Sequence, residues 1–224
     1  MDSIIEVVRC FENSNIIHVD GVINPTNDIE IIELELIYAD LETVMKRRER
    51  VKKQLKADKS LAKEDLVLEK IEKVLNEGKS ARSLELTEEE KDIIKSLSLL
   101  TLKPLMYVAN VDEETIQNPE SNENFKKVKQ YAESQNAKVI PICVKLEEEI
   151  SSIESEDERK EFLEMMGLDK SGLDKLIIAS YDILGLMSYL TVRRNRSKSM
   201  DDKKRYKSTK SGIKDTFRYR KRVY

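Results

Sequence analysis

The sequence is poor in the residues that tight turns, metal sites and aromatic cores require. Its 224 residues include no Trp, 6 Gly, 4 Pro and one histidine, His18, and only 5% are aromatic. A compact all-β fold needs more turn-forming and aromatic residues, and a single histidine cannot form a histidine-based metal cluster or triad. No stretch reaches the roughly 18 apolar residues of a membrane span. We therefore expect a helix-rich cytoplasmic protein with no signal peptide and no membrane partner.

Charge is abundant and unevenly distributed. Charged residues make up 37% of the chain and the formal net charge is −3, whereas about a quarter is typical. Residues 193–224 contain fourteen Lys or Arg and three Asp, so this tail is strongly basic and the remainder is acidic. The excess of Lys and Glu favours long solvated helices. The basic tail indicates either an interaction segment or a different origin.

Residues 25–100 show helical periodicity. Apolar residues recur every three to four positions after Pro25, with Arg48 filling one place in the stripe. The stripe consists of Leu34, Ile37, Leu41, Val44, Val51 and Leu55. A second stripe, ended by Gly78, consists of Leu61, Leu68, Ile71 and Leu75. Thr87 and Glu90 have the spacing of a capping box before a third helix. We predict an antiparallel helical (coiled-coil) arm.

Strands and helices alternate outside the arm, which predicts an α/β fold with a parallel sheet. The predicted strands are residues 4–11, 104–109 and 138–144, and the predicted helices are residues 122–135, 156–166 and 172–190. Residues 16–19 are a further short apolar run between the turn signals at residues 12–15 and 20–21. The expected core-facing positions of the last helix are Leu173, Leu176, Ile177, Ser180, Leu184 and Met187. Cys10 and Cys143 lie in apolar runs and are expected to be small buried residues rather than a disulfide or ligand pair.

Candidate binding residues follow two of these strands. Parallel sheets bind ligands beyond the carboxyl ends of their strands. Asn110, Val111 and Glu113 follow one strand, and Cys143 and Lys145 end another. An amide and a carboxylate there can hydrogen-bond to the edge of a purine. By itself such a loop is more often an ordinary turn, and Lys145 is as consistent with a solvated residue as with a base contact.

The residues for holding a triphosphate are missing from the sequence. It contains no G-x-x-x-x-G-K-[ST] motif and no other Gly-rich turn between a strand and a helix. Without these backbone N–H groups, the Lys and the Ser or Thr hydroxyl, neither phosphates nor Mg²⁺ have ligands. The run at residues 147–149 (EEE) is expected to be a solvated face.

Several segments resemble YchF-type Obg-like ATPases. Residues 9–21 (RCFENSNIIHVDG) resemble the segment after switch II of that family, and residues 24–41 continue the likeness into its helical arm. Residues 100–104 (LTLKP) and 107–111 (YVANV) resemble the strand leading to its base-reading loop. The likeness extends from about residue 4 to residue 192.

This resemblance implies a P-loop NTPase domain with an inserted helical arm, ATP as the nucleotide with Mg²⁺, and the ribosome as a partner. DNA is not an expected partner. Asn110 and Glu113 match the Asn-x-x-Glu with which the family favours ATP over GTP, and Cys143, Val144 and Lys145 stand where a Ser-Ala-Lys-like motif is usual. The P-loop and both switches should precede residue 4, so the chain resembles a truncated internal fragment.

The basic tail departs from the family. Back-translated and read from the second base of each codon, residues 197–202 can read VRAWTI, residues 204–209 KGTKAP and residues 214–224 KIHSDTEKGFI. These strings resemble the start of the family's TGS domain. We therefore favour a frameshift as the origin of the tail over a selected RNA-attracting segment.

The predicted organisation follows from these observations. Residues 1–24 are a remnant of the NTPase domain, residues 25–100 the arm, residues 101–192 the C-terminal half of the NTPase domain and residues 193–224 the tail. We expect the strands at residues 4–11 and 104–109 to be short of neighbours and to expose sheet edges, and we predict marginal stability or aggregation on expression. The favoured function is a base-reading but hydrolytically inactive relative of the ATPase. The alternatives are an active ATPase with a longer gene and an RNA- or ribosome-binding helical module without nucleotide chemistry.

Overall fold

The structure is a computed structural model that describes residues 1–12, 23–193 and 196–203, and side chains as far as residue 188. The short apolar run at residues 16–19, which includes His18, and the turn signal at residues 20–21 lie outside the described residues. The principal elements are β1 (Ile4–Arg9), α1 (Pro25–Leu55), α2 (Ala62–Asn76), α3 (Glu88–Ile94), β2 (Leu105–Asn110), α4 (Glu123–Ser134), β3 (Lys138–Ile142), α5 (Val144–Ser152), α6 (Glu156–Met165), α7 (Gly172–Leu184), β4 (Leu186–Arg193) and β5 (Arg196–Lys203). Short 3-10 turns link them at Lys59–Leu61 (η1), Ala81–Ser83 (η2), Lys95–Leu97 (η3), Leu100–Leu102 (η4) and Pro119–Ser121 (η5).

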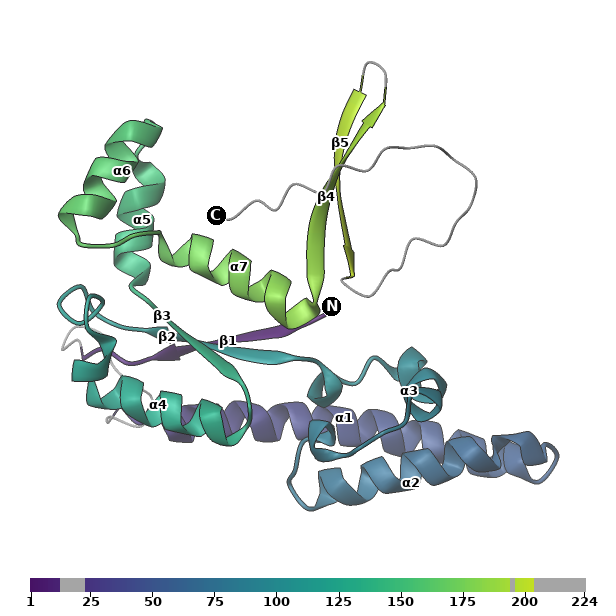
Figure 1. The fold of residues 1–224 in the computed structure, drawn as a ribbon. Coiled ribbons are helices and arrows are strands. Elements are labelled where there is room, and N and C mark those ends of the chain that lie inside the picture. The colour runs from purple at the N-terminus through teal and green to yellow at the C-terminus, as the bar shows by residue number, and fades with distance from the viewer. Residues whose placement is uncertain (13–22, 194–195, 204–224) are drawn as a thin grey trace.

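A three-stranded parallel sheet in the order β1-β2-β3 lies at the centre of the molecule (Figure 1). The α/β fold with a parallel sheet is thereby confirmed. The first five residues of β2 are buried, because this strand has a neighbour on each side. The expectation that residues 104–109 are short of neighbours is therefore wrong. β1 forms an edge, and its Ile5 and Val7 are 40% and 62% exposed, so this strand is not fully buried as predicted.

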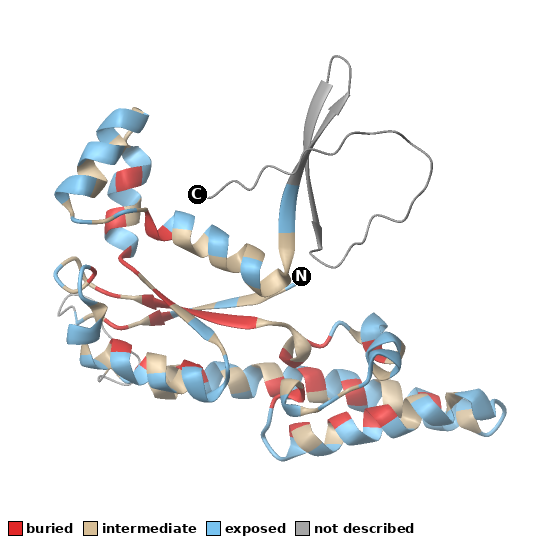
Figure 2. Cartoon of the chain, viewed as in Figure 1, coloured by how far each residue is buried: buried red, intermediate tan, exposed pale blue. Residues whose placement is uncertain are grey.

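Helices cover the two faces of the sheet (Figures 1 and 2). On one face α1 and α4 pack through Ile29, Phe125 and Val128 against residues of the strands. On the other face α7 packs against β2 and β3 through Leu176, Ala179 and Ile183. Three of the predicted core positions of the last helix are wrong. Leu173 and Ile177 are 57% and 48% exposed, and Met187 lies beyond the helix in β4, where it is 36% exposed.

The arm consists of α1, which returns through η1 into α2, followed by α3 (Figure 1). Ile37, Val44 and Val51 of α1 are buried against the predicted second stripe, including Leu68 and Leu75. The helical pairing is confirmed, while a coiled coil in the strict sense stays a prediction. Leu34 does not belong to the seam: it is 42% exposed. The sheltered side of α1 there passes through Ile29, Glu33 and Ile37, which are spaced by four residues.

The ends of the arm helices follow the predicted signals. Gly78 lies just beyond α2 with φ +72°, a left-handed conformation that favours glycine. The backbone N–H of Glu90 donates to Thr87 Oγ1 at 3.3 Å, and the Thr87 N–H donates to Glu90 Oε2 at 2.9 Å. The capping box at the start of α3 is therefore confirmed.

Arg48 is the electrostatic centre of the arm. Its guanidinium donates to Asp65 at 3.2 Å, to Glu69 at 2.6 Å and to Glu72 at 2.6 Å, all on α2, while its own side chain is only 13% exposed. Hydrogen bonding to Glu72, with further bonds to the other two carboxylates, raises the pKa of Arg48. The polar residue in an otherwise apolar stripe thus joins α1 to α2 by three ion pairs.

A second polar contact closes the base of the arm. The buried carboxylate of Asp40 accepts hydrogen bonds from the Leu100 N–H at 2.8 Å, the Thr101 N–H at 2.7 Å and Thr101 Oγ1 at 2.6 Å. Three donors satisfy a buried charge that would otherwise be costly. The chain therefore re-enters the sheet domain close to the middle of α1.

Titratable side chains gather where the sheet meets α1. Tyr131 Oη donates to Glu33 at 2.8 Å, and Arg82 lies 3.9 Å from the same carboxylate. The rings of Tyr107 and Tyr131 meet edge to face at 6.2 Å, and the buried Tyr107 Oη has no hydrogen-bond partner among the residues that the structure describes. Burial, together with Glu33, raises the pKa of Glu6 to about 7. Acidic groups are therefore concentrated at this junction with one nearby Arg.

Three predicted element boundaries are wrong. The predicted strand at residues 4–11 ends at Arg9. The last helix ends at Leu184 because Gly185 takes a left-handed conformation (φ +62°), and residues 186–190 belong to β4 instead. The predicted strand at residues 138–144 ends at Ile142, because Cys143 is the N-cap of α5. Val144 and Lys145 are therefore helical.

The predicted basic tail begins at the end of β4. Residues 196–203 form β5, which pairs with β4 in an antiparallel ladder. Residues 204–224 lie outside the described residues, so a frameshifted origin of the tail stays a prediction. Within the described part of the chain, no helix is both long and apolar enough to cross a membrane.

Candidate functional site

The carboxyl ends of β2 and β3 lie side by side, as expected for a ligand-binding edge. Asn110 closes β2 and pairs in register with Ile142 at the end of β3. The Val111 N–H donates to the Ile142 carbonyl at 2.9 Å, and the Cys10 N–H donates to the Asn110 carbonyl at 2.8 Å. These bonds fix the three chain segments where they leave the sheet.

The Asn110 side chain links this edge to α5. Its Oδ1 accepts a hydrogen bond from the Val144 N–H at 3.2 Å, in the first turn of that helix. An amide oxygen has two lone pairs and the amide nitrogen two protons. Among the described residues no group bonds to Asn110 Nδ2, so both its protons and one lone pair of Oδ1 are available.

Glu113 and Lys145 form an ion pair across the two loops. The Lys145 Nζ lies 2.5 Å from Glu113 Oε1, and the Lys145 side chain is 71% exposed. The hydrogen bond to Glu113 raises the pKa of Lys145. The fold thus brings together three of the predicted site residues: Asn110, Glu113 and Lys145.

The other two predicted residues belong to the core. Val111 and Cys143 are 1% and 4% exposed, and both pack in the cluster beneath α4. Burial raises the pKa of the Cys143 thiol. Their side chains support the loops without facing the edge, and the expected burial of both cysteines is confirmed.

Neighbouring residues hold the loops in place. Asp112 Oδ1 accepts from the Thr115 N–H at 2.8 Å and from Thr115 Oγ1 at 2.6 Å, which is the ordinary turn considered from the sequence. Asn122 Nδ2 donates to the Cys10 carbonyl at 2.9 Å while its Oδ1 caps α4. The sequence signals only the capping role of Asn122, because its partner is 112 residues away.

Glu147 corrects another expectation. The sequence predicts that it belongs to a solvated acidic face, but its carboxylate accepts hydrogen bonds from the Gly172 N–H at 2.6 Å and the Leu173 N–H at 3.0 Å. It therefore holds the N-terminus of α7, where a negative charge is favourable. A Cβ on Gly172 would lie 2.9 Å from Glu147 Oε1 and 2.9 Å from Ile142 Cγ2, so this close approach requires glycine. Nothing in the sequence distinguishes Glu147 from its two neighbours.

The enclosed space near this edge is small. A void of about 10 Å³ lies beneath α5, between residues such as Ile142, Leu146 and Gly172. That volume holds at most about one water molecule. A ligand at Asn110 and Glu113 would therefore lie on the open edge of the sheet.

Known proteins share both the sequence and this geometry. The chain is 46% identical over 209 residues to the ribosome-binding ATPase YchF of Bacillus subtilis (strain 168), a match that covers 93% of this chain and 57% of that protein. It is 44% identical over 191 residues to the ribosome-binding ATPase YchF of Escherichia coli O157:H7, covering 85% of this chain and 52% of the relative. The chain belongs to the YchF-type family of Obg-like ATPases.

The solved structure of a YchF-type GTPase from Schizosaccharomyces pombe superposes on this chain with a TM-score of 0.78 at 31% identity, covering 91% of this chain and 55% of that one. The described fold is therefore the YchF fold. The chain spans about half the length of the curated relatives it matches. It matches no protein-family model.

The YchF relatives are named for nucleotide chemistry, so the fit of a nucleotide to these residues can be tested. The free amide protons of Asn110 and the carboxylate of Glu113 suit the edge of a purine. The sequence supplies no Gly-rich loop for the phosphates. Within the described residues, no three His, Cys, Asp or Glu side chains form a metal-binding group. The residues present fit the base and not the triphosphate or Mg²⁺.

Proposed function

We propose that this chain carries the base-reading edge of a YchF-type nucleotide site and binds the purine of ATP through Asn110, Glu113 and Lys145. The observation that best supports this proposal is the 2.5 Å ion pair between Lys145 and Glu113, which joins the segments that follow β2 and β3. Together with the bond from Val144 to Asn110, it orients two side chains toward one edge before a ligand arrives. Preorganised polar groups lose little entropy on binding.

The roles of the side chains follow from their free hydrogen-bonding groups. Asn110 can donate from Nδ2 to adenine N7 and accept from the N6 amino group, the usual pairing of Asn with adenine. Glu113 can accept from an exocyclic N–H, and Lys145 holds that carboxylate in place. ATP when bound supplies the phosphoanhydride that YchF-type ATPases hydrolyse. The chain itself supplies base recognition, and we expect no hydrolysis from it.

The relatives differ in the nucleotide that their names imply. The curated relatives are named ATPases and the solved structure is named a GTPase. Adenine offers a donor and an acceptor at N6 and N7, whereas guanine offers two acceptors at O6 and N7. The paired acceptor and donor of Asn110 match adenine, so we propose that this chain favours adenosine over guanosine.

Titration of the chain with adenosine and guanosine, followed by amide NMR shifts, tests this proposal. We expect weak saturable binding of adenosine and about tenfold weaker binding after Glu113→Ala, the loss of about 1.4 kcal/mol for one charged hydrogen bond. Glu114→Ala is the matched control, because Glu114 is an exposed neighbour on the same loop. Equal losses from both variants, or tighter binding of guanosine, would contradict the assignment.

We also propose ribosome association, on the basis of the names of the curated relatives. Co-sedimentation of the chain with ribosomal subunits through a sucrose cushion tests it. The result is independent of adenosine binding, because no part of the base-reading edge need contact the ribosome. Absence of the chain from the ribosomal pellet at low salt would refute the association.

A further inference from the structure

Helix α1 has a second apolar face, which we call its outer face. It consists of four residues spaced by three, four and seven positions, each between 42% and 65% exposed: Ile31, Leu34, Tyr38 and Met45. This spacing places all four on one side of the helix. The outer face lies roughly 125° around the helix axis from the buried side of α1, which includes Ile29, Ile37, Val44 and Val51. A contiguous exposed apolar face of this kind marks an interaction surface.

The charge of α1 changes sign along the helix. Residues 25–40 contain five Asp or Glu and no Lys or Arg, whereas residues 46–55 contain six Lys or Arg and one Glu. Two such helices repel each other when they are parallel and attract each other when they are antiparallel, because only the antiparallel arrangement places each acidic half beside a basic half. The partner whose charge matches the outer face is therefore α1 of a second copy of this chain.

We propose that two copies of this chain associate through the outer faces of their α1 helices, which lie antiparallel about a two-fold axis near residue 40. Such an axis places opposite each other the residues whose numbers add up to about 80. Leu34 then lies opposite Met45 of the second copy, and Tyr38 lies opposite Leu41. Each of these contacts occurs twice, because the interface is symmetric.

Exposed charged side chains lie on both sides of this apolar contact. On one side Glu35 lies opposite Lys46 of the second copy, and on the other side Glu30 lies opposite Lys52. Each pair joins opposite charges. Charged pairs that flank an apolar seam set the orientation of two helices, so these pairs favour the antiparallel arrangement.

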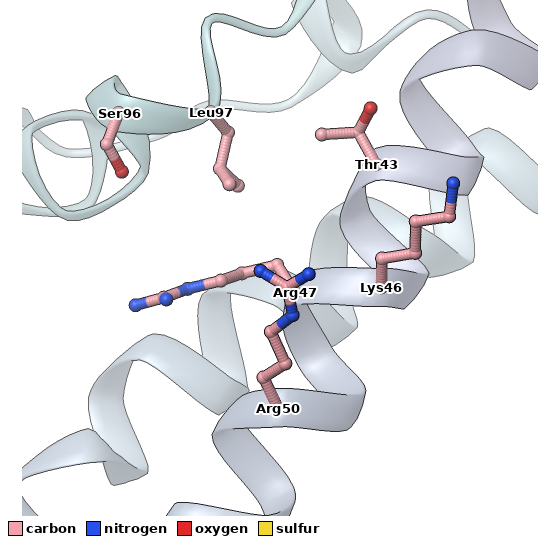
Figure 3. Close-up of a pocket in the computed structure, with 6 residues that line it drawn as sticks. All are labelled: Thr43, Lys46, Arg47, Arg50, Ser96 and Leu97. Atoms are coloured by element: carbon pink, nitrogen blue, oxygen red, sulfur yellow. The ribbon is translucent and has the colours of Figure 1, made fainter.

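Lys46 is placed to take part in such a pair. Figure 3 shows its side chain directed away from Ser96 and Leu97, and therefore away from the turn η3 of the arm. Within its own helix Lys46 pairs with Glu42, where both side chains are about two-thirds exposed. An ammonium group has three donors, so Lys46 can bond to a carboxylate of the second copy as well.

The contact is small, which predicts a weak dimer. Each copy contributes four apolar side chains to it, whereas stable interfaces bury about 800 Å² on each partner. We therefore expect a dissociation constant on the order of 50 μM, with single chains at about 1 μM protein and dimers at about 500 μM.

Sedimentation equilibrium of the full chain without nucleotide, over about 5–500 μM, tests the proposal. Leu34→Gln should raise the dissociation constant of the dimer about tenfold, because symmetry places the lost apolar contact in the interface twice. Leu66→Gln is the matched control: Leu66 is 58% exposed on α2, outside the outer face, and its substitution should leave the dissociation constant unchanged.

Charge reversal tests the antiparallel arrangement. Glu35→Lys and Lys46→Glu should each raise the dissociation constant about tenfold, because each creates two like-charge pairs in the interface. The double variant Glu35→Lys/Lys46→Glu restores opposite charges between the copies, and its dissociation constant should lie within about threefold of the wild-type value. The two positions are about 16 Å apart along one helix, so a bond within one chain cannot produce this restoration.

Three results would overturn the proposal. They are the mass of a single chain at every concentration, an equal effect of Leu34→Gln and Leu66→Gln, and two weakened single variants without restoration in the double variant. Circular dichroism of each variant should show unchanged helicity, because the substituted side chains are exposed. Self-association and adenosine binding fail independently, because the residues proposed to contact ATP lie outside the outer face.

Discussion

Arg48→Met should destabilise the arm strongly, because it removes the common partner of three carboxylates. Met fills much of the space of the Arg stem and keeps the helix-forming propensity. The charge has no substitute: Asp65 and Glu72 are 19% and 23% exposed, so both would keep a largely buried charge without its partner. Glu69 is 57% exposed and adds little.

The expected loss of stability in Arg48→Met follows from the burial of these carboxylates. Breaking a buried ion pair costs about 3–5 kcal/mol, and the partial exposure of the carboxylates places Arg48→Met at the lower end, about 3 kcal/mol. Arg48→Lys should cost about 1–2 kcal/mol, since one ammonium cannot bond to three carboxylates at once. Arg50→Met is the matched control: it lies two residues away, is exposed, and should change the free energy of unfolding by less than about 0.5 kcal/mol.

Urea unfolding followed by circular dichroism at the helix band measures these differences. With a slope of about 2 kcal/mol/M, Arg48→Met should lower the midpoint by about 1.5 M. The deficit should shrink near pH 4, because protonation removes the charges left without a partner. A midpoint for Arg48→Met within about 0.3 M of that for Arg50→Met would refute the electrostatic account of the arm.

Three further perturbations test other contacts. Glu6 has a folded-state pKa of about 7 against an ordinary value of 4.5, so its contribution to the free energy of unfolding is fully present below pH 4.5 and is lost as the pH rises through 7. Allowing for its partial exposure, the wild type should lose about 1–2 kcal/mol of stability between about pH 5 and 8. Thermal melts across that range should show this loss in the wild type and not in Glu6→Gln. Glu147→Ala should lower the free energy of unfolding by about 1–2 kcal/mol, because two N–H groups of α7 lose their acceptor. Glu148→Ala should change the free energy of unfolding in urea by less than about 0.5 kcal/mol, and similar losses for the two variants would contradict the capping role. Thr87→Ala should cost about 1 kcal/mol and increase hydrogen exchange at the Glu90 amide, which loses its acceptor; unchanged exchange there would argue against the capping box.

The arm was predictable because its signals are local. Ile37, Val44 and Val51 repeat every seven residues, and Thr87 and Glu90 stand three residues apart, so each pattern lies within one helix. Leu34 fits the same spacing and is nevertheless exposed. Its environment depends on where α1 leaves the sheet domain and joins α2, which the period of one helix does not contain.

In the candidate site, too, the residues with local sequence signals were predicted and those that depend on distant contacts were missed. The position of Asn110 after a buried strand predicts its place at the edge of the sheet, and the family resemblance supplies Glu113 and Lys145. The early end of β3 was missed because Cys143 has no typical capping side chain, and α5 begins there through a bond from its first turn to Asn110. Glu147 was missed because its partner N–H groups lie 25 and 26 residues away. Contacts between distant segments decide both positions.

The helix α1 joins the two hydrophobic cores of the molecule as one continuous element. Ile29 packs with the sheet, whereas Val51 packs in the arm, and about 33 Å of helix separates them at 1.5 Å per residue. A rotation of about 10° at the sheet would displace Val51 by about 6 Å over that length. By this geometry α1 would act as a mechanical lever: a small reorientation beside the proposed base-reading edge would become a large displacement at the far end of the arm.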